Sequence, residues 1–405
     1  MIGLVKGSGP VTDRSIGVGA VGLGWMGRLH SRSYRALAEK FPELGATVRL
    51  VSACDAQPET RKAALEGMGF QRAVEDYREV IADPEVDVVS ICSPNFLHRE
   101  IALAAAAAGK PFWIEKPMGT NAAQSRDIAE AARAAGLVTA VGFNYRHAPA
   151  IERARELIRG GRLGRITNVR CWLIADYASS PDGPLTWRDS REYGGSGVIG
   201  DLMSHGVDLV QYLVGRIESV TAATGQFITE RPIPLKAGVG HSGWEVSDKK
   251  GPVENEDWIA MIGRLEGGAL ATLEACRVAT GPRAEYVVEV YGSDGSVRWN
   301  FEHLNDLLVA VGRGQEFTGY KHVMAGHDFP RFGNFQPSPG TSMGFDDLKV
   351  VEASQFIGSV LAGQQLAPSV YDGLAAAEVD EAAMASAADG RWHDVPPVEG
   401  VTHNR

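Results

Sequence analysis

The first third of the chain alternates short apolar runs with longer segments in which apolar residues recur at helical spacing. The apolar runs lie at 16–23, 48–54, 86–92, 112–114 and 138–143. Strands joined by helices form right-handed crossovers, and such crossovers give a parallel sheet that is covered on both faces. We therefore predict an α/β domain with a parallel sheet at 15–145, preceded by a loose lead-in at 1–14.

After residue 143 the pattern changes to that of an α+β domain. Helical periodicity is confined to 148–158, 198–214, 346–361 and 373–388, and strand patterns lie at 167–174, 219–227, 258–265, 269–275 and 286–291. Asp294-Gly295 follows the last of these strands and is typical of a hairpin turn. We predict a second domain at 146–405 with a large, mostly antiparallel, open-faced sheet.

Two segments of this second domain, 232–254 and 320–343, are rich in glycine, proline and polar residues and fit neither pattern. We expect them to be long loops. Loops of that length in a compact domain are often lids over a site or arms at an interface.

Composition narrows the function classes. A length of 405 residues is too great for one core, and 44% hydrophobic with 22% charged residues is ordinary for a globular protein. The net charge of -10 opposes binding to nucleic acid or anionic lipid, and the longest apolar run, 101–108, is far shorter than the roughly 20 residues that cross a bilayer. The start of the chain lacks a secretory signal and the four cysteines are scattered without metal-ligand spacing, so we expect a cytoplasmic protein with no metal site.

A glycine pattern follows the first predicted strand and opens the first predicted helix. Its sequence is Gly22-Leu23-Gly24-Trp25-Met26-Gly27, which is Gly-x-Gly-x-x-Gly. The first glycine permits a tight turn, the second lets the backbone approach a pyrophosphate, and the third allows close helix packing. Because the chain contains 48 glycines, the motif gains weight only from its place between strand and helix. We predict that this turn, Trp25 and Met26 included, binds a dinucleotide.

The second predicted strand ends at Asp55, where a carboxylate can accept hydrogen bonds from ribose hydroxyls and repel a 2′-phosphate. This favours NAD over NADP. Asp55 lies 33 residues after Gly22, more than the usual spacing of about 20, and we attribute the excess to an insertion at 37–46. The alternative is an aspartate that only shapes the turn at the strand end.

Polar residues also follow the third and fourth strands. Ser93-Pro94-Asn95 precedes a helix that carries His98, and the next strand ends in Glu115-Lys116-Pro117. The carboxyl ends of parallel strands meet at one edge, so we expect Ser93, Asn95, His98, Glu115 and Lys116 beside the cofactor. The alternatives are a Pro-Asn turn with a solvated histidine and a surface lysine. To act near neutrality, a lysine needs burial or a second positive charge to lower its pKa.

In the second domain a glycine-rich segment at 194–197 precedes a helical pattern with Asp201 and His205. Four residues apart, the two side chains share one helix face, so His205 can take a proton while Asp201 orients it or anchors a substrate. An exposed Asp/His pair is the alternative.

In this order, and with Gly-Phe-Asn-Tyr-Arg at 142–146, the motifs resemble the glucose-fructose oxidoreductase/inositol dehydrogenase (Gfo/Idh/MocA) family over nearly the whole chain. The resemblance implies an N-terminal Rossmann domain that binds NAD(P), with Asn144 among the residues that contact the cofactor. It further implies a C-terminal sheet that carries substrate contacts and oligomer interfaces. It also implies a catalytic group of Lys116, Asp201 and His205, and a homodimer or homotetramer.

We therefore expect an NAD-dependent dehydrogenase that oxidises a secondary hydroxyl of a cyclic sugar or polyol to a ketone. His205 removes the hydroxyl proton, Lys116 polarises the same oxygen and Asp201 fixes the geometry. Tyr145, Trp187 and Arg188 are candidates for ring stacking and hydroxyl contacts, although aromatic residues at these positions can equally belong to the core.

Within the family, the patterns at 180–188 and 251–257 are similar to members that oxidise levoglucosan, whereas the segments 37–46 and 327–344 depart from them. The expected substrate is accordingly levoglucosan-, inositol- or pyranose-like. Two alternatives stay open: a redox-assisted glycosidase that retains NAD, and a non-catalytic dinucleotide-responsive protein of the same fold.

Overall fold

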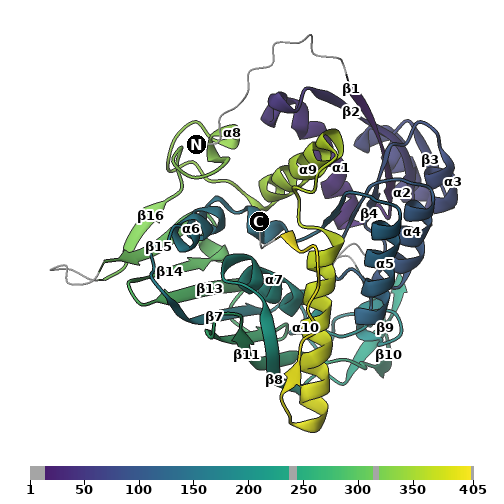
Figure 1. Ribbon diagram of the computed structural model, residues 1–405. Helices are drawn as coiled ribbons and strands as arrows, with labels where there is room; N and C mark the ends of the chain where they lie inside the picture. Colours follow the sequence, from purple (N-terminus) through teal and green to yellow (C-terminus); the bar gives the residue numbers. More distant parts are fainter. Residues whose placement is uncertain (1–13, 237–243, 313–318, 403–405) are drawn as a thin grey trace.

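The computed structural model describes residues 14–236, 244–312 and 319–402. Most of the predicted lead-in lies outside these ranges. The described residues form a six-stranded sheet, a nine-stranded sheet and a separate two-stranded ribbon, with helices around and between them (Figure 1).

The first sheet is parallel, with strand order β3-β2-β1-β4-β5-β6. Its strands are β1 (Arg14–Val21), β2 (Ala46–Cys54), β3 (Arg72–Val74), β4 (Val88–Ile91), β5 (Phe112–Ile114) and β6 (Thr139–Val141). Its helices are α1 (Trp25–Lys40), α2 (Pro58–Ala63), α3 (Tyr77–Ala82), α4 (Asn95–Ala107) and α5 (Ala122–Ala134). This is the predicted α/β architecture, and the strand order reverses direction between β1 and β4, where such sheets bind ligands.

The long spacing between the glycine turn and Asp55 has a simple structural basis. Helix α1 continues to Lys40, and a 3₁₀ turn at Pro42–Leu44 then leads into β2. Strand β3 and helix α3 were not predicted, because three and six residues are too few to display a period.

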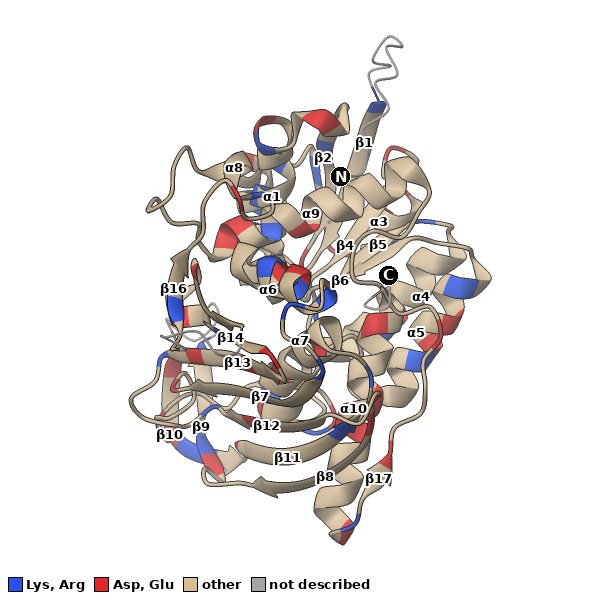
Figure 2. Ribbon diagram, turned by 60° about the vertical axis from the view of Figure 1, so that its left-hand side comes forward, with Lys and Arg blue, Asp and Glu red and all other residues tan. Residues whose placement is uncertain are grey.

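The second sheet has the order β16-β15-β14-β13-β7-β12-β11-β8-β17 and is antiparallel except between β7 and β12. Its strands are β7 (Ile166–Ala175), β8 (Ile217–Gly225), β11 (Trp258–Leu265), β12 (Leu270–Cys276), β13 (Ala284–Gly292), β14 (Gly295–Asn300), β15 (Asp306–Val311), β16 (Lys321–Met324) and β17 (His393–Asp394). As predicted, Asp294 lies in the hairpin between β13 and β14. Helices α6 (Pro149–Arg159), α7 (Ser204–Leu213) and α10 (Val370–Asp389) lie along one face (Figure 2).

The two unassigned segments are more regular than expected, which corrects the prediction of long loops. Strands β9 (Glu230–Lys236) and β10 (Glu245–Pro252) form the two-stranded ribbon, with residues 237–243 outside the described ranges. The segment 320–343 contributes β16 and the short helix α8 (Phe332–Phe335). Prolines and a shifted register in β9 and β10 obscure the alternation that identifies a strand.

Helix α9 (Phe345–Ala362) returns from the second sheet to the first and packs against α1. Its buried residues Val351, Phe356 and Ile357 join a cluster with Tyr34 and Leu37 of α1. The C-terminal part of the chain therefore supplies a wall of the first domain.

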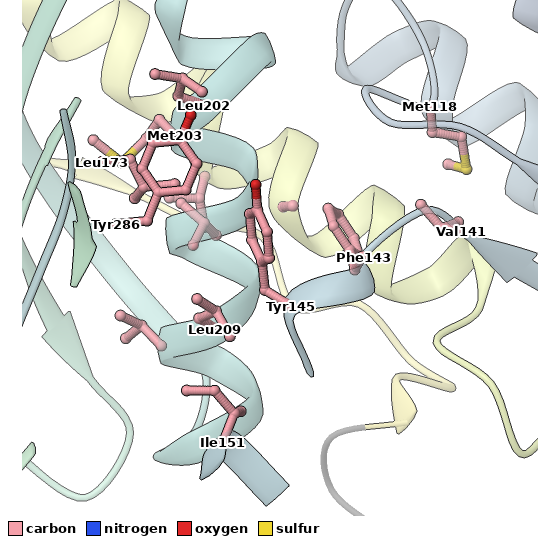
Figure 3. Close-up of a cluster of buried hydrophobic side chains, with 14 of the residues drawn as sticks. Met118, Val141, Phe143, Tyr145, Ile151, Leu173, Leu202, Met203, Leu209 and Tyr286 are labelled. Atoms are coloured by element: carbon pink, nitrogen blue, oxygen red, sulfur yellow. The ribbon is translucent and has the colours of Figure 1, made fainter. Parts of the chain in front are cut away.

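A larger apolar cluster continues from the first domain into the second. Figure 3 shows Tyr145 standing between Phe143 and the helix that carries Leu202, Met203 and Leu209. The two sheets therefore share one apolar core. Within the described ranges, no helix is both long and apolar enough to cross a membrane.

Candidate active site

A cavity of about 1230 Å³ lies between the carboxyl edge of the first sheet and the second domain. Of the residues predicted for the site, the structure places sixteen in its lining: Gly22, Gly24, Trp25, Met26, Asp55, Ser93, Asn95, His98, Glu115, Lys116, Asn144, Tyr145, Trp187, Arg188, Asp201 and His205. Gly27, the remaining predicted residue, is not part of the lining and packs against Gly22. The cavity thus joins residues that are far apart in the sequence.

The glycine turn has the shape that a dinucleotide requires. Gly22 has φ of 85°, and a Cβ there would lie 2.6 Å from the Cys92 carbonyl oxygen. A Cβ on Gly27 would lie 2.0 Å from the Gly22 carbonyl oxygen, whereas one on Gly24 would meet nothing within 4 Å. Two glycines are therefore needed for packing, and the third leaves open space at the N-terminus of α1.

Two buried polar atoms in the same lining have no hydrogen-bond partner in the described structure. They are Ser93 Oγ and Asn144 Nδ2. Buried polar groups are normally satisfied, so unpartnered ones on cavity-lining residues leave room for hydrogen bonds to a polar ligand. With the glycine turn, they fit a bound dinucleotide.

Asp55 lies at the end of β2 with both carboxylate oxygens already in use. Oδ2 accepts from the Leu23 N–H at 2.9 Å and Oδ1 accepts from the Gln57 N–H at 2.9 Å. These contacts are those of a turn aspartate, but each carboxylate oxygen retains a lone pair for a further donor. Arg61 is held nearby, since it donates to the Asp55 and Ala56 carbonyls.

Lys116 and Asp201 form an ion pair across the cavity. Lys116 Nζ lies 2.9 Å from Asp201 Oδ1 and 2.8 Å from the Asp201 carbonyl oxygen. Tyr177 donates from its hydroxyl to Asp201 Oδ2 at 2.5 Å. Burial alone raises the pKa of Asp201, but Lys116, Arg188 and the Tyr177 hydrogen bond together hold it well below its usual range. Asp201 is therefore a fixed negative charge that holds the Lys116 ammonium in place.

Asp201 and His205 do not share one regular α-helix. Asp201 lies in a π-helical turn, Ile199–Met203, that precedes α7, and π turns inside helices often mark functional sites. Both side chains still reach the same cavity. Since Asp201 is engaged by Lys116 and Tyr177, its contacts orient the lysine.

His205 lies at the start of α7, only 5% exposed, against the rings of Tyr145 and Phe143, with centroid distances of 4.5 and 6.0 Å. Burial lowers its pKa well below the usual value, and the positive charges of Lys116 and Lys349 lower it further. The imidazole is neutral at pH 7 and able to accept a proton.

His98 and Glu115 brace the loops around the cavity. The His98 ring nitrogens lie 3.0 Å from the Pro117 carbonyl oxygen and 2.8 Å from that of Ser93. Burial lowers the pKa of His98, and a neutral imidazole has one N–H, so it donates to one of these oxygens. Glu115 Oε1 contacts His30 and Lys349.

Trp187 and Arg188 form part of the cavity rim. The Trp187 ring meets Phe96 of α4 in an edge-to-face contact with centroids 6.3 Å apart, and the Arg188 guanidinium lies 4.3 Å from the Trp187 ring centroid. Tyr145, in contrast, is buried among Phe301, Tyr286 and His205. Its contacts are largely those of a core residue.

Two protein-family models match the sequence of this chain. One describes an oxidoreductase family with an NAD-binding Rossmann fold and matches 16–143; the other describes the GFO/IDH/MocA C-terminal domain and matches 151–298. The chain belongs to the Gfo/Idh/MocA family. The resemblance inferred from the motifs is thus confirmed, and the first domain is an NAD-binding Rossmann domain.

Several known proteins are similar in sequence to this chain over nearly its full length. Levoglucosan dehydrogenase of Pseudarthrobacter phenanthrenivorans is 35% identical, with 95% of this chain and 99% of that protein covered. Inositol 2-dehydrogenase of Rhizobium meliloti is 26% identical, with 92% and 97% covered. The solved structure of levoglucosan dehydrogenase with NADH and levoglucosan has a TM-score of 0.89 at 34% identity, covering 95% of this chain and 100% of that chain.

Sequence reasoning missed two residues of this site, Tyr177 and Lys349. Neither belongs to a motif, and their partners Asp201 and Glu115 lie 24 and 234 residues away in the sequence. Within the part of the chain that the structure describes, no group of three or more His, Cys, Asp or Glu is arranged to hold a metal ion.

Proposed function

We propose that this Gfo/Idh/MocA oxidoreductase oxidises a secondary hydroxyl of a closed-ring, uncharged sugar or cyclitol to a ketone, with NAD as cofactor. The observation that carries the proposal is the pairing of Lys116 with Asp201 beside a neutral His205, in the cavity that also holds the glycine turn. The named relatives act on levoglucosan and inositol, substrates of this class. The unpaired cysteines support a reducing, cytoplasmic compartment.

The chain's own residues prepare the hydroxyl for oxidation. NAD, when bound, supplies the acceptor for the hydride that leaves the carbinol carbon. His205 accepts the hydroxyl proton, and Lys116 donates a hydrogen bond to the same oxygen and stabilises its developing negative charge. Asp201 holds the Lys116 ammonium and balances its charge.

The charges near the cavity support a neutral substrate. Arg277 is neutralised by Asp257 at 2.9 Å, and Arg283 by Asp176 at 2.6 Å. The lysines that the two unassigned segments could have brought over the site are absent from the described cavity lining: Lys236, Lys249, Lys250 and Lys321. Arg188 also lines the cavity and is balanced in part by Asp201, whose pKa it lowers. A phosphate clamp needs several free cations, so we infer that the site favours hydroxyl groups over phosphates.

A competition experiment tests the substrate class. Levoglucosan, inositols and free hexoses are compared with sugar phosphates and sugar acids by kcat/KM with NAD. We expect a clear preference for the neutral rings. Preference for charged compounds would move the search to sugar acids, and cleavage of glycosides without net NADH would favour the redox-assisted glycosidase.

Asp55→Ala is expected to narrow the preference for NAD over NADP, because the variant lacks the carboxylate that repels a 2′-phosphate. The measurement is the ratio of kcat/KM values for the two cofactors. Glu59→Ala, an exposed change in the first turn of α2, is the control and should leave the ratio unchanged. Equal use of both cofactors by the wild type would contradict the role of Asp55.

We also propose a homodimer or homotetramer that uses the open face of the second sheet. This face is hollowed and carries Ile262 and Leu270, which are 45% and 50% exposed. Apolar side chains on a sheet face are commonly buried by a symmetric partner. Light scattering should give two or four times the mass of one chain, and Ile262→Glu should reduce it. A wild-type monomer at micromolar concentration would refute the proposal.

A further inference from the structure

Lys349, on α9, is an almost fully buried lysine that lines the cavity wall. It is 1% exposed, and its Nζ lies 2.5 Å from Glu115 Oε1 and 2.9 Å from Glu352 Oε2. Lysine is almost never fully buried unless it is paired. Both of its carboxylate partners are themselves buried, so the cluster is held away from water.

Helix α1 supplies a second contact to the same oxygen of the Glu115 carboxylate. His30 Nε2 lies 2.9 Å from Glu115 Oε1, and His30 Nδ1 lies 3.3 Å from Ser90 Oγ. Burial lowers the pKa of His30 to about 4, so its ring is neutral and carries one proton. Burial raises the pKa of Glu115, but Lys349 and His30 outweigh it and keep the carboxylate ionised. His30 therefore donates from Nε2 to Glu115.

These contacts to Glu115 lie next to the lysine of the active site. Glu115 directly precedes Lys116, and its backbone N–H donates to the Ile91 carbonyl at 2.9 Å, which ties the end of β5 to β4. A Cβ on Gly142 would come within 2.7 Å of both Glu115 oxygens, so the carboxylate has little room for another position. Fixing Glu115 therefore fixes the start of the Lys116 side chain.

We propose that Lys349 is a positioning residue for catalysis: by clamping the Glu115 carboxylate from the C-terminal part of the chain, it sets the place from which Lys116 reaches Asp201 and the substrate. The inference rests on the proposed dehydrogenase function and assigns a task to α9. The same helix begins at Phe345, whose ring stacks on that of Trp25 in the glycine turn, with the ring centroids 5.6 Å apart. One helix thus contacts both the cofactor turn and the catalytic lysine's neighbour.

A purely structural ion pair would behave differently. Buried ion pairs are often no more stabilising than well-packed neutral residues of similar volume, so removing the charges of Lys349 and Glu115 need not unfold the protein. Burial raises the pKa of the second partner, Glu352, to about 7, so this carboxyl can take up a proton and stay neutral once Lys349 is gone. A neutral replacement of the pair would then keep full activity. A positioning role instead predicts that the neutral pair folds and still loses turnover.

The charge of Lys349 also acts on His205. The charged groups that face this imidazole are Lys116, Lys349, Glu115 and Asp201, and the rings of Tyr145 and Phe143 pack against it. Lys349 lowers the pKa of His205 and Glu115 raises it. Loss of Lys349 alone should therefore move the His205 titration to higher pH, and loss of both charges should return it toward the wild-type position.

The test compares Lys349→Met, the double variant Glu115→Gln/Lys349→Met, and Lys62→Met as an exposed control. The measurements are kcat, KM, the acidic limb of the pH profile, NADH affinity by fluorescence titration, and the His205 titration by imidazole NMR in cofactor-free protein. We expect kcat to fall about 10- to 100-fold in both Lys349 variants, with KM and NADH affinity little changed. The NMR titration should move upward in Lys349→Met and back in the double variant.

If Lys349→Met does not fold, the double variant decides. A kcat in the double variant within twofold of the wild type overturns the proposal, whatever the stability, and so does a rise in KM at unchanged kcat. An unmoved His205 titration in a folded Lys349→Met overturns the charge effect. The NADH affinity and the His205 titration can be measured without turnover, and every measurement is compared with the wild type. Failure of the positioning role can therefore be distinguished from failure of the proposed function, in which the wild type itself oxidises no polyol.

Discussion

Lys116→Met is expected to lower kcat by about 10²-fold or more, with NAD affinity nearly unchanged. Methionine retains the length of the side chain and removes the donor that polarises the substrate oxygen. It also leaves Asp201, among the described residues, with Tyr177 as its remaining side-chain donor and Arg188 as the nearby positive charge. Steady-state kinetics and a fluorescence titration with NADH measure the two effects separately.

Lys110→Met provides the matched control for this change. Lys110 is also partly buried and also donates to a backbone carbonyl, that of Asp83, but it is not part of the described cavity lining. It should keep wild-type turnover. If Lys116→Met lost NAD binding and turnover in parallel, the lysine would belong to cofactor binding rather than to substrate activation.

His205→Asn is expected to remove a similar factor, about 10²-fold or more, together with the acidic limb of the pH profile. Burial, Lys116 and Lys349 lower the pKa of His205, so the wild type should keep its base deprotonated below pH 6.5 and lose activity only as pH falls further. Asparagine fills part of the space but has no titrating group. The pH dependence of kcat/KM measures both features.

The exposed His303 supplies the control, since His303→Asn changes an imidazole outside the described cavity lining. Its pH profile should match the wild type. Near-normal turnover of His205→Asn across the pH range would show that another group removes the proton.

Periodicity was sufficient for most of the fold. The apolar runs of the first domain are long enough to mark its main strands, and Asp294-Gly295 marks the hairpin between β13 and β14. No pattern in the sequence indicated that α9 returns to the first domain. Its apolar residues, such as Val351 and Phe356, show that the helix is buried but not against which sheet.

The candidate site likewise contains residues that the sequence alone could place and residues that it could not. Residues in motifs, such as Gly22 and Lys116, could be placed because strand ends in a parallel sheet converge on one edge. Tyr177 and Lys349 could not, since each acts through a contact that only the folded chain creates. The role of Asp201 also depended on the structure. Its spacing to His205 suggested that it orients the histidine or anchors a substrate, whereas in the structure its carboxylate pairs with Lys116.

The measurement that bears most directly on the proposed function is product formation from one neutral cyclic polyol. Purified protein, NAD and levoglucosan or an inositol are incubated, and NADH and ketone are quantified together, with substrate deuterated at the carbinol carbon as a second sample. We predict NADH and ketone in equal amounts, slower formation from the deuterated substrate, and formation of both products slowed about 10²-fold or more in Lys116→Met. No NADH from any neutral ring, or ring-containing products released from glycosides without net NADH, would contradict the account.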